Sequence, residues 1–196
     1  MTSAHDPLHY LLEGNRRYSQ GTPAHPRSGP ERRGEVCRGQ EPFAMILSCS
    51  DSRVPPEIIF DCGLGDLFVV RTAGHTLDKV TVGSLEFALL ELHIPLLIVL
   101  GHSACGAVSA AVKAWQGKHD QHGCDIDAVT DQIIPAIERA GDARGDLVTE
   151  TTFAHIAGTI ETLRRSRHIS AAEQRGSLKI VGAFYDLSSG RVELRV

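Results

Sequence analysis

The stretch AMILSCSDSR (44–53) carries three chemically active side chains on alternate positions, directly after an apolar run. They are a thiol, a carboxylate and a guanidinium: Cys49, Asp51 and Arg53. An apolar run of this kind is typical of a buried strand. We therefore expect the strand to place Cys49 at its end and the two charged groups just beyond it.

A second group of this kind lies some fifty residues later, in the segment GHSACG (101–106). It contains His102 and Cys105, three residues apart at an expected turn from a strand to a helix. Cys105 falls in the first turn of that helix, where the helix dipole lowers the pKa of a thiol. With Cys49 they form a Cys₂His set, which suits a catalytic zinc ion with an open fourth position.

Each of these residues also has a simpler interpretation. Cys49 could be a buried core thiol, and His102 could be satisfied by backbone groups at a strand end. Asp51 and Arg53 could be an ion pair in a turn. The coincidence of all of them at neighbouring strand ends favours the zinc site.

The carboxylate and guanidinium have roles that fit such a centre. Asp51 could accept a hydrogen bond from zinc-bound hydroxide, and Arg53 could keep that carboxylate ionised in a bidentate pair. Asp51 is also close enough in sequence to Cys49 to reach the metal itself as a fourth ligand and close the site.

The elements that position these residues alternate between apolar runs and helical periods. Expected strands cover 43–49, 66–74 and 94–102, and expected helices cover 80–93, 104–115, 125–140 (interrupted by Pro135) and 147–167. The segment 176–196 is predicted to form a strand, a turn and an antiparallel strand. Apolar strands joined by helices indicate an α/β fold with a mostly parallel central sheet flanked by helices. Ligands of such sheets bind at the carboxyl ends of the strands, where both groups are expected.

The first forty residues are expected to form an N-terminal arm within a single domain covering 1–196. Apolar residues at helical spacing predict a helix within 6–21, and Pro and Gly predict an extended connection over 22–34. The arm could pack on a partner subunit or cover one face of its own sheet, and the residues alone leave both open.

Composition excludes several classes of protein. The net charge is −4 and aromatic residues make up 5% of 196 residues, which gives nucleic acid no basic, aromatic surface to bind. The most apolar run, 94–101, is far shorter than the roughly 20 residues that span a membrane. The amino terminus lacks the apolar core of a signal peptide, so we expect a cytoplasmic protein with reduced thiols. Five cysteines then favour metal binding or catalysis over disulfides.

Two segments, CSDSRVPPEIIFDCGLGDLFVVRTAGH and GSLEFALLELHIPLLIVLGHSACGAV, strongly resemble the β-class carbonic anhydrases. The resemblance implies that Cys49, His102 and Cys105 bind one Zn²⁺ per chain and that Asp51 and Arg53 form a catalytic dyad. It implies a lyase, carbonate dehydratase, in which zinc-bound hydroxide reversibly hydrates CO₂ to bicarbonate and a proton.

The same resemblance implies a substrate pocket and a partner. Gln40 matches a glutamine that in many members binds substrate oxygen across a dimer interface, so a homodimer or a dimer of dimers is expected. Phe68 and Phe87 match apolar pocket positions, although many members carry Tyr at the position of Phe87. The backbone amide of Gly106 falls where it can approach the substrate.

Other functions remain open from the residues. The same zinc site could act on carbonyl sulfide or carbon disulfide, or could be a non-catalytic zinc module. GHSAC also approaches the nucleophile elbow of serine hydrolases, with Ser103 as nucleophile, but this leaves Cys49 and Asp51 unexplained. The polar loop His119–Cys124 could bind a metal and is more typical of a solvated loop.

Overall fold

The computed structural model describes residues 6–117, 124–141 and 145–196. In these residues a central sheet has the strand order β2-β1-β3-β4-β5. Strands β1, β2, β3 and β4 run parallel, and β5 pairs antiparallel with β4. The strands are β1 (Ala44–Cys49), β2 (Leu67–Thr72), β3 (Leu96–His102), β4 (Lys179–Tyr185) and β5 (Val192–Leu194). This confirms the predicted α/β fold and its antiparallel C-terminal edge strand.

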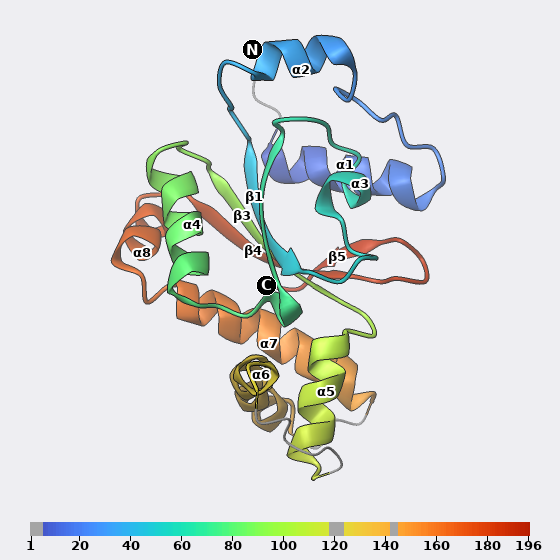
Figure 1. The fold of residues 1–196 in the computed structure, drawn as a ribbon, viewed down its shortest axis with the longest axis vertical. Coiled ribbons are helices and arrows are strands. Elements are labelled where there is room, and N and C mark those ends of the chain that lie inside the picture. The colour runs from blue at the N-terminus through green and yellow to red at the C-terminus, as the bar shows by residue number, and fades with distance from the viewer. Residues whose placement is uncertain (1–5, 118–123, 142–144) are drawn as a thin grey trace.

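Helices cover both faces of the sheet and its carboxyl edge (Figure 1). They are α1 (Pro7–Ser19), α2 (Pro30–Val36), α3 (Pro56–Ile59), η1 (Ala73–His75), α4 (Lys79–Leu90), α5 (Gly106–Trp115), α6 (Ile126–Ala140), α7 (Leu147–Leu163) and α8 (Arg167–Gln174). In Figure 1, α1 and α3 lie on one side of the strands and α4 and α8 on the other, while α5 and α6 lie beyond the end of β1.

Alternation along the buried strands divides the core into two layers. Met45 and Leu47 of β1 pack with apolar residues of α4, α7 and α8. Ala44 and Ile46 pack on the opposite face with residues of α1 and the α3 region. Because side chains of a strand point alternately to the two faces, a fully apolar strand fills both layers. Each fully buried side chain of this size contributes about 1.5–3 kcal/mol.

Helix α7 approaches the sheet closely at two glycines. A Cβ at Gly101 of β3 would lie 2.7 Å from Ile156 Cδ1, and one at Gly182 of β4 would lie 2.7 Å from Ile156 Cγ2. Contacts this short do not occur between real carbon atoms, so glycine is required for α7 to lie at this distance. This packing brings α7 up to the carboxyl end of β3.

A third cluster closes the carboxyl edge of the sheet. It joins Cys49 and Cys105 to Val108 of α5 and to Ile133 and Ile137 of α6. The predicted metal ligands therefore lie in an apolar layer beneath two helices.

The first helix packs on the core of its own chain. Leu8 and Leu11 are buried in the layer beneath α1. Asn15 donates to the carbonyls of Ile59 and Gly190 and accepts from the amide of Val192. In contrast α2 has no buried residue. A contact of the arm with a partner subunit stays a prediction, as does the single-domain boundary.

Two local expectations were wrong, and one helix was not predicted. The connection over 22–34 is not extended throughout, because Pro30 begins α2 at the first helical position, where proline needs no N–H partner. Pro135 does not interrupt α6, which continues through it at the loss of one backbone hydrogen bond. The chain after α7 turns into α8, which is capped by the Ser166 hydroxyl and was not predicted.

No described helix is both long and apolar enough to cross a membrane.

Candidate metal centre

The structure brings Cys49, His102 and Cys105 together. Their ligand atoms all lie within 4.8 Å of one another, and all three residues are buried. Cys49 ends β1 and His102 ends β3, which are neighbouring parallel strands. Cys105 is the N-cap of α5 rather than a residue of its first turn. In the turn between His102 and Cys105, Ala104 has a left-handed φ of 50°. This conformation reverses the chain so that the side chains of His102 and Cys105 face one centre.

The Cys49 and Cys105 thiols are close enough to share a hydrogen bond, and each shifts the pKa of the other. The Cys49 and Cys105 sulfurs are 4.0 Å apart. Hydrogen bonding from the Cys105 thiol, with smaller contributions from the backbone amides of Asp51 and Gly74, lowers the pKa of Cys49 despite its burial. The same bond, together with burial, raises the pKa of Cys105. A cation between the sulfurs would stabilise both as thiolates.

His102 presents one nitrogen to this centre. Its Nδ1 lies 2.9 Å from the carbonyl oxygen of Ser103, which can only accept, so Nδ1 carries the proton. Its Nε2 is buried and has no hydrogen-bond partner in the described part of the chain. A buried nitrogen lone pair with no donor is costly, and metal coordination removes that cost.

These residues fit a zinc ion. With Zn–S bonds of about 2.3 Å, a tetrahedral centre places two thiolate sulfurs about 3.8 Å apart. The observed separation of 4.0 Å is close to this value. Two sulfurs and one imidazole nitrogen supply three ligands, and a catalytic zinc site keeps its fourth position for water or substrate.

Asp51 and Arg53 lie in the turn after β1 and form a bidentate pair. Arg53 donates from Nε to Oδ1 at 2.9 Å and from Nη2 to Oδ2 at 2.7 Å. The Arg53 guanidinium, with its backbone amide, holds the pKa of the Asp51 carboxyl well below its usual range, although burial opposes the shift. Arg53 Nη2 also lies 3.3 Å from the carbonyl of Ala104, which ties this turn to the loop that carries Cys105.

Arg71 has a role that the sequence analysis missed. From β2 it donates to the carbonyl of Cys49 at 3.0 Å and to that of Asp51 at 2.6 Å. One guanidinium thus holds the backbone on both sides of Ser50. A charged residue near the end of an apolar strand is the sequence signal that could have identified this position.

The expected substrate-pocket residues do not gather at the metal ligands of their own chain. Phe68 pairs in register with Met45, four residues before Cys49, which corresponds to about 13 Å along the strand. The Phe87 ring is 6.4 Å from that of Phe68 and is half-exposed on α4. Gln40 is exposed ahead of β1, at the opposite edge of the sheet. Gly106 is next to Cys105, as expected.

Ser103 does not have the surroundings of a catalytic nucleophile. Its Oγ accepts a hydrogen bond from the amide of Leu187 at 2.9 Å. No histidine in the described part of the chain contacts this hydroxyl, and His155 instead hydrogen bonds to Gly74. The loop His119–Cys124 lies outside the described residues except for Cys124, which is exposed.

A parallel α/β sheet with a buried Cys₂His cluster and an arginine-held aspartate at its carboxyl edge is an arrangement that suits a zinc-dependent enzyme. The family model described as carbonic anhydrase matches residues 44–192. A carbonic anhydrase of Mycolicibacterium smegmatis is 43% identical over 94% of this chain and 90% of its own length. Carbonic anhydrase 2 of Mycobacterium tuberculosis is 44% identical over 94% of this chain and 89% of its own. The chain belongs to the β-class carbonic anhydrase family.

Solved structures show the same fold. The β-carbonic anhydrase CcaA is 28% identical, with a TM-score of 0.73 over 96% of this chain and 95% of that one. Tetrameric β-carbonic anhydrases of Sordaria macrospora give a TM-score of 0.76 at 23% identity, over 97% of each chain.

Proposed function

We propose that this chain reversibly hydrates CO₂ to bicarbonate and a proton at a zinc ion held by Cys49, His102 and Cys105. The observation that carries the proposal is the buried Cys₂His cluster, whose imidazole Nε2 lacks a partner, beside a carboxylate fixed by arginine. Bound zinc would supply a Lewis acid that makes hydroxide available from water near neutral pH.

Asp51 and Arg53 supply the proton chemistry beside the metal. A carboxylate oxygen of Asp51 can accept a hydrogen bond from the attacking oxygen and so direct its lone pair toward the carbon of CO₂. Arg53 keeps that carboxylate ionised and in place. The backbone amide of Gly106 can donate to the developing bicarbonate. Release of Asp51 from Arg53 toward the metal would close the site, and this switch stays part of the proposal.

A second copy of the chain completes the substrate pocket in this proposal. Gln40, Phe68 and Phe87 lie away from the metal ligands of their own chain. In a homodimer, the residues of one subunit can instead lie beside the metal ligands of the other. Strand β2 is an edge strand in the described residues and is only half-buried, which leaves its outer side available to a partner. A dimer of dimers is consistent with the tetrameric relatives of Sordaria macrospora.

Metal removal and reconstitution test this function. Chelator-treated protein should not hydrate CO₂, and one equivalent of Zn²⁺ per chain should restore the activity. Cys49→Ser should lose both metal and activity, whereas Cys37→Ser, at an exposed thiol outside the cluster, should keep both. A reconstituted protein that converts carbonyl sulfide or carbon disulfide but not CO₂ would contradict the proposed substrate, and one that converts none of them would indicate a non-catalytic zinc module.

A further inference from the structure

Cys49 receives two backbone hydrogen bonds on its sulfur. The amide of Asp51 lies 3.4 Å from Sγ, as expected from its neighbouring position in the turn. The amide of Gly74 lies 3.3 Å from Sγ and comes from η1, after the adjacent strand β2. Amide donors withdraw charge from a thiolate and so tune the metal that it binds. The position of Gly74 therefore matters to the metal centre.

The turn that presents Gly74 has an unfavourable backbone conformation. Gly74 has φ of 62° and the next residue, His75, has φ of 45°, so two successive residues are left-handed. For a residue with a side chain this region costs about 1–2 kcal/mol. A Cβ at Gly74 would lie 2.9 Å from Ile133 Cδ1 and 3.0 Å from Ala107 Cβ. Surrounding contacts must therefore hold this turn in place.

His155 of α7 makes the central contact. Its Nε2 lies 2.8 Å from the carbonyl oxygen of Gly74, and since a carbonyl only accepts, Nε2 carries the proton. His155 is only 6% exposed, and burial lowers its pKa, which favours the neutral ring. The ring of His75 packs against it at a centroid distance of 4.4 Å and an interplanar angle of 35°, and neither nitrogen of the His75 ring has a hydrogen-bond partner among the described residues. The pair of rings thus buttresses the turn from α7.

We propose that His155 is a positioning residue of the metal centre. Its N–H fixes the carbonyl of Gly74, and the turn so fixed directs the Gly74 amide to the Cys49 sulfur. Gln132 of α6 supports the far end of the same segment, because its Oε1 accepts from the amide of Leu77 at 2.9 Å. The inference rests on the proposed metal site. It adds His155, which is neither one of the three expected metal ligands nor a member of the Asp51–Arg53 pair.

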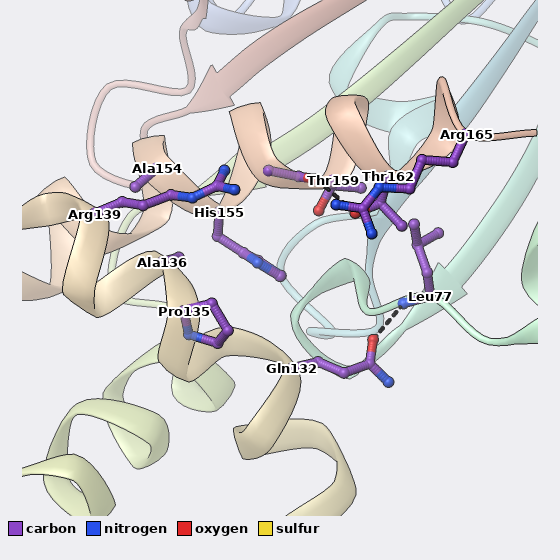
Figure 2. A pocket seen from close by; sticks show the side chains of 11 residues that line it. Leu77, Gln132, Pro135, Ala136, Arg139, Ala154, His155, Thr159, Thr162 and Arg165 are labelled. Atoms are coloured by element: carbon purple, nitrogen blue, oxygen red, sulfur yellow. Dashed lines mark hydrogen bonds between the residues drawn. The ribbon is translucent and has the colours of Figure 1, made fainter. Parts of the chain in front are cut away.

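The surroundings of His155 allow this role to be tested by substitution. Figure 2 shows the ring reaching from α7 toward the segment of Leu77, beside a pocket between α6 and α7. The pocket has a volume of about 310 Å³. His155 lines this pocket, so its side chain borders open space as well as packed residues.

Two variants separate the hydrogen bond from the bulk of the ring. His155→Phe keeps an aromatic ring and removes the donor, whereas His155→Gln keeps an N–H at similar reach. Zinc affinity is measured by competition with a chromophoric chelator. The thiolate-to-metal charge-transfer band is measured on protein fully loaded with Co²⁺, because a loss of stability alone does not move that band.

The proposal predicts that His155→Phe binds zinc about 10–100-fold more weakly, the usual effect of losing a hydrogen-bond partner of the metal ligands. Its charge-transfer band should move to lower energy, because the thiolate loses an amide donor. His155→Gln should stay close to wild type in both measurements. Thr151→Val is the matched control, since Thr151 is a fully buried residue one turn earlier on α7 whose hydroxyl has no hydrogen-bond partner within the residues that the structure describes.

Two results would overturn the inference. Wild-type affinity and spectrum in His155→Phe would show that the bond to Gly74 does not reach the metal. Equal losses in the Phe and Gln variants would assign the effect to packing of the imidazole. If His155→Phe does not fold, His155→Leu takes its place. Failure of the wild-type chain itself to bind zinc or Co²⁺ is a separate result, which contradicts the metal centre as a whole.

Discussion

Asp51 carries a fixed negative charge at the edge of the ligand cluster. Both of its carboxylate oxygens are held by Arg53, and the guanidinium of Arg71 holds the backbone carbonyl of the same residue. None of these bonds involves a metal ligand side chain. Asp51 can therefore be changed with the three ligands left intact.

Asp51→Asn is expected to retain zinc and to lose turnover, by about 10²-fold or more, because the amide is a poor proton acceptor and loses the charged pair with Arg53. The measurement is CO₂ hydration with zinc content determined on the same sample. Asp78→Asn is the control, since Asp78 caps α4 and asparagine caps a helix equally well. Near-wild-type turnover in Asp51→Asn would remove Asp51 from the mechanism.

For single residues, the sequence predicts the positions that follow from adjacency in the chain or from the ends of neighbouring strands. Cys49, Asp51 and Arg53 follow one strand and His102 ends a neighbour of it, so the parallel topology is sufficient to bring them together. The Gly74–His155 contact joins residues 81 positions apart on a turn and a helix face. It depends on the rotation and depth of α7, which a periodic apolar pattern does not specify.

At the scale of the elements, α7 depends on glycine in the sheet. Gly101→Ala would place Cβ 2.7–2.9 Å from Ile156 and 2.9 Å from Thr152. The resulting overpacking should lower the free energy of unfolding by about 1–3 kcal/mol. Gly83→Ala in α4 meets nothing within 4 Å and should instead raise it by about 0.5–1 kcal/mol. Urea unfolding of both variants tests this, and equal effects would contradict the close packing of α7.

The N-terminal arm depends on one buried carboxylate. Asp61 accepts from Arg17 Nε at 2.7 Å and from the amides of Ala24 and His25 at 2.9 and 2.8 Å. Burial raises the pKa of Asp61, but these donors outweigh it and the net shift is downward. A depressed pKa gives stability that is present above the unfolded value of about 3.9 and lost as the pH falls through the folded value.

Asp61→Asn should therefore destabilise the protein by roughly 3 kcal/mol near pH 7, the usual cost of breaking a largely buried ion pair. The difference from wild type should stay constant between about pH 5 and 8 and shrink below about pH 4. Glu13→Gln, at an exposed pair with Arg16, should cost less than about 1 kcal/mol. A difference for Asp61→Asn that grows on acidification would contradict the assigned role.

The strands and the long helices were predictable because they are apolar or periodic. Helices α2 and α8 could not be predicted in this way. Both are short, of 7 and 8 residues, and their positions are set by Pro30 and by the Ser166 cap rather than by an apolar pattern. Whether α1 packs on its own chain or on a partner subunit was open for a related reason. An amphipathic helix shows that it must be covered, but its sequence does not say by which chain.

At the scale of the whole molecule, we predict active sites that are shared between two copies of the chain. Asp51→Asn has a defective dyad with an intact pocket, and Phe68→Ala has the reverse. If the pocket comes from the partner, a mixed dimer of the two variants contains one site with both parts intact. Mixing and re-equilibrating the two proteins should then restore activity well above that of either variant. No gain on mixing, with mixed dimers demonstrated, would place Phe68 in its own chain's site or outside the pocket.

The most direct test of the proposed function is stopped-flow CO₂ hydration from pH 6.5 to 9 on protein of known zinc content. We predict one zinc per chain and a rate per zinc that rises with pH, because hydroxide becomes available at an open site. One zinc per chain with no CO₂ hydration at any pH would contradict it. Folded protein that binds no zinc would contradict the role of Cys49, His102 and Cys105 directly.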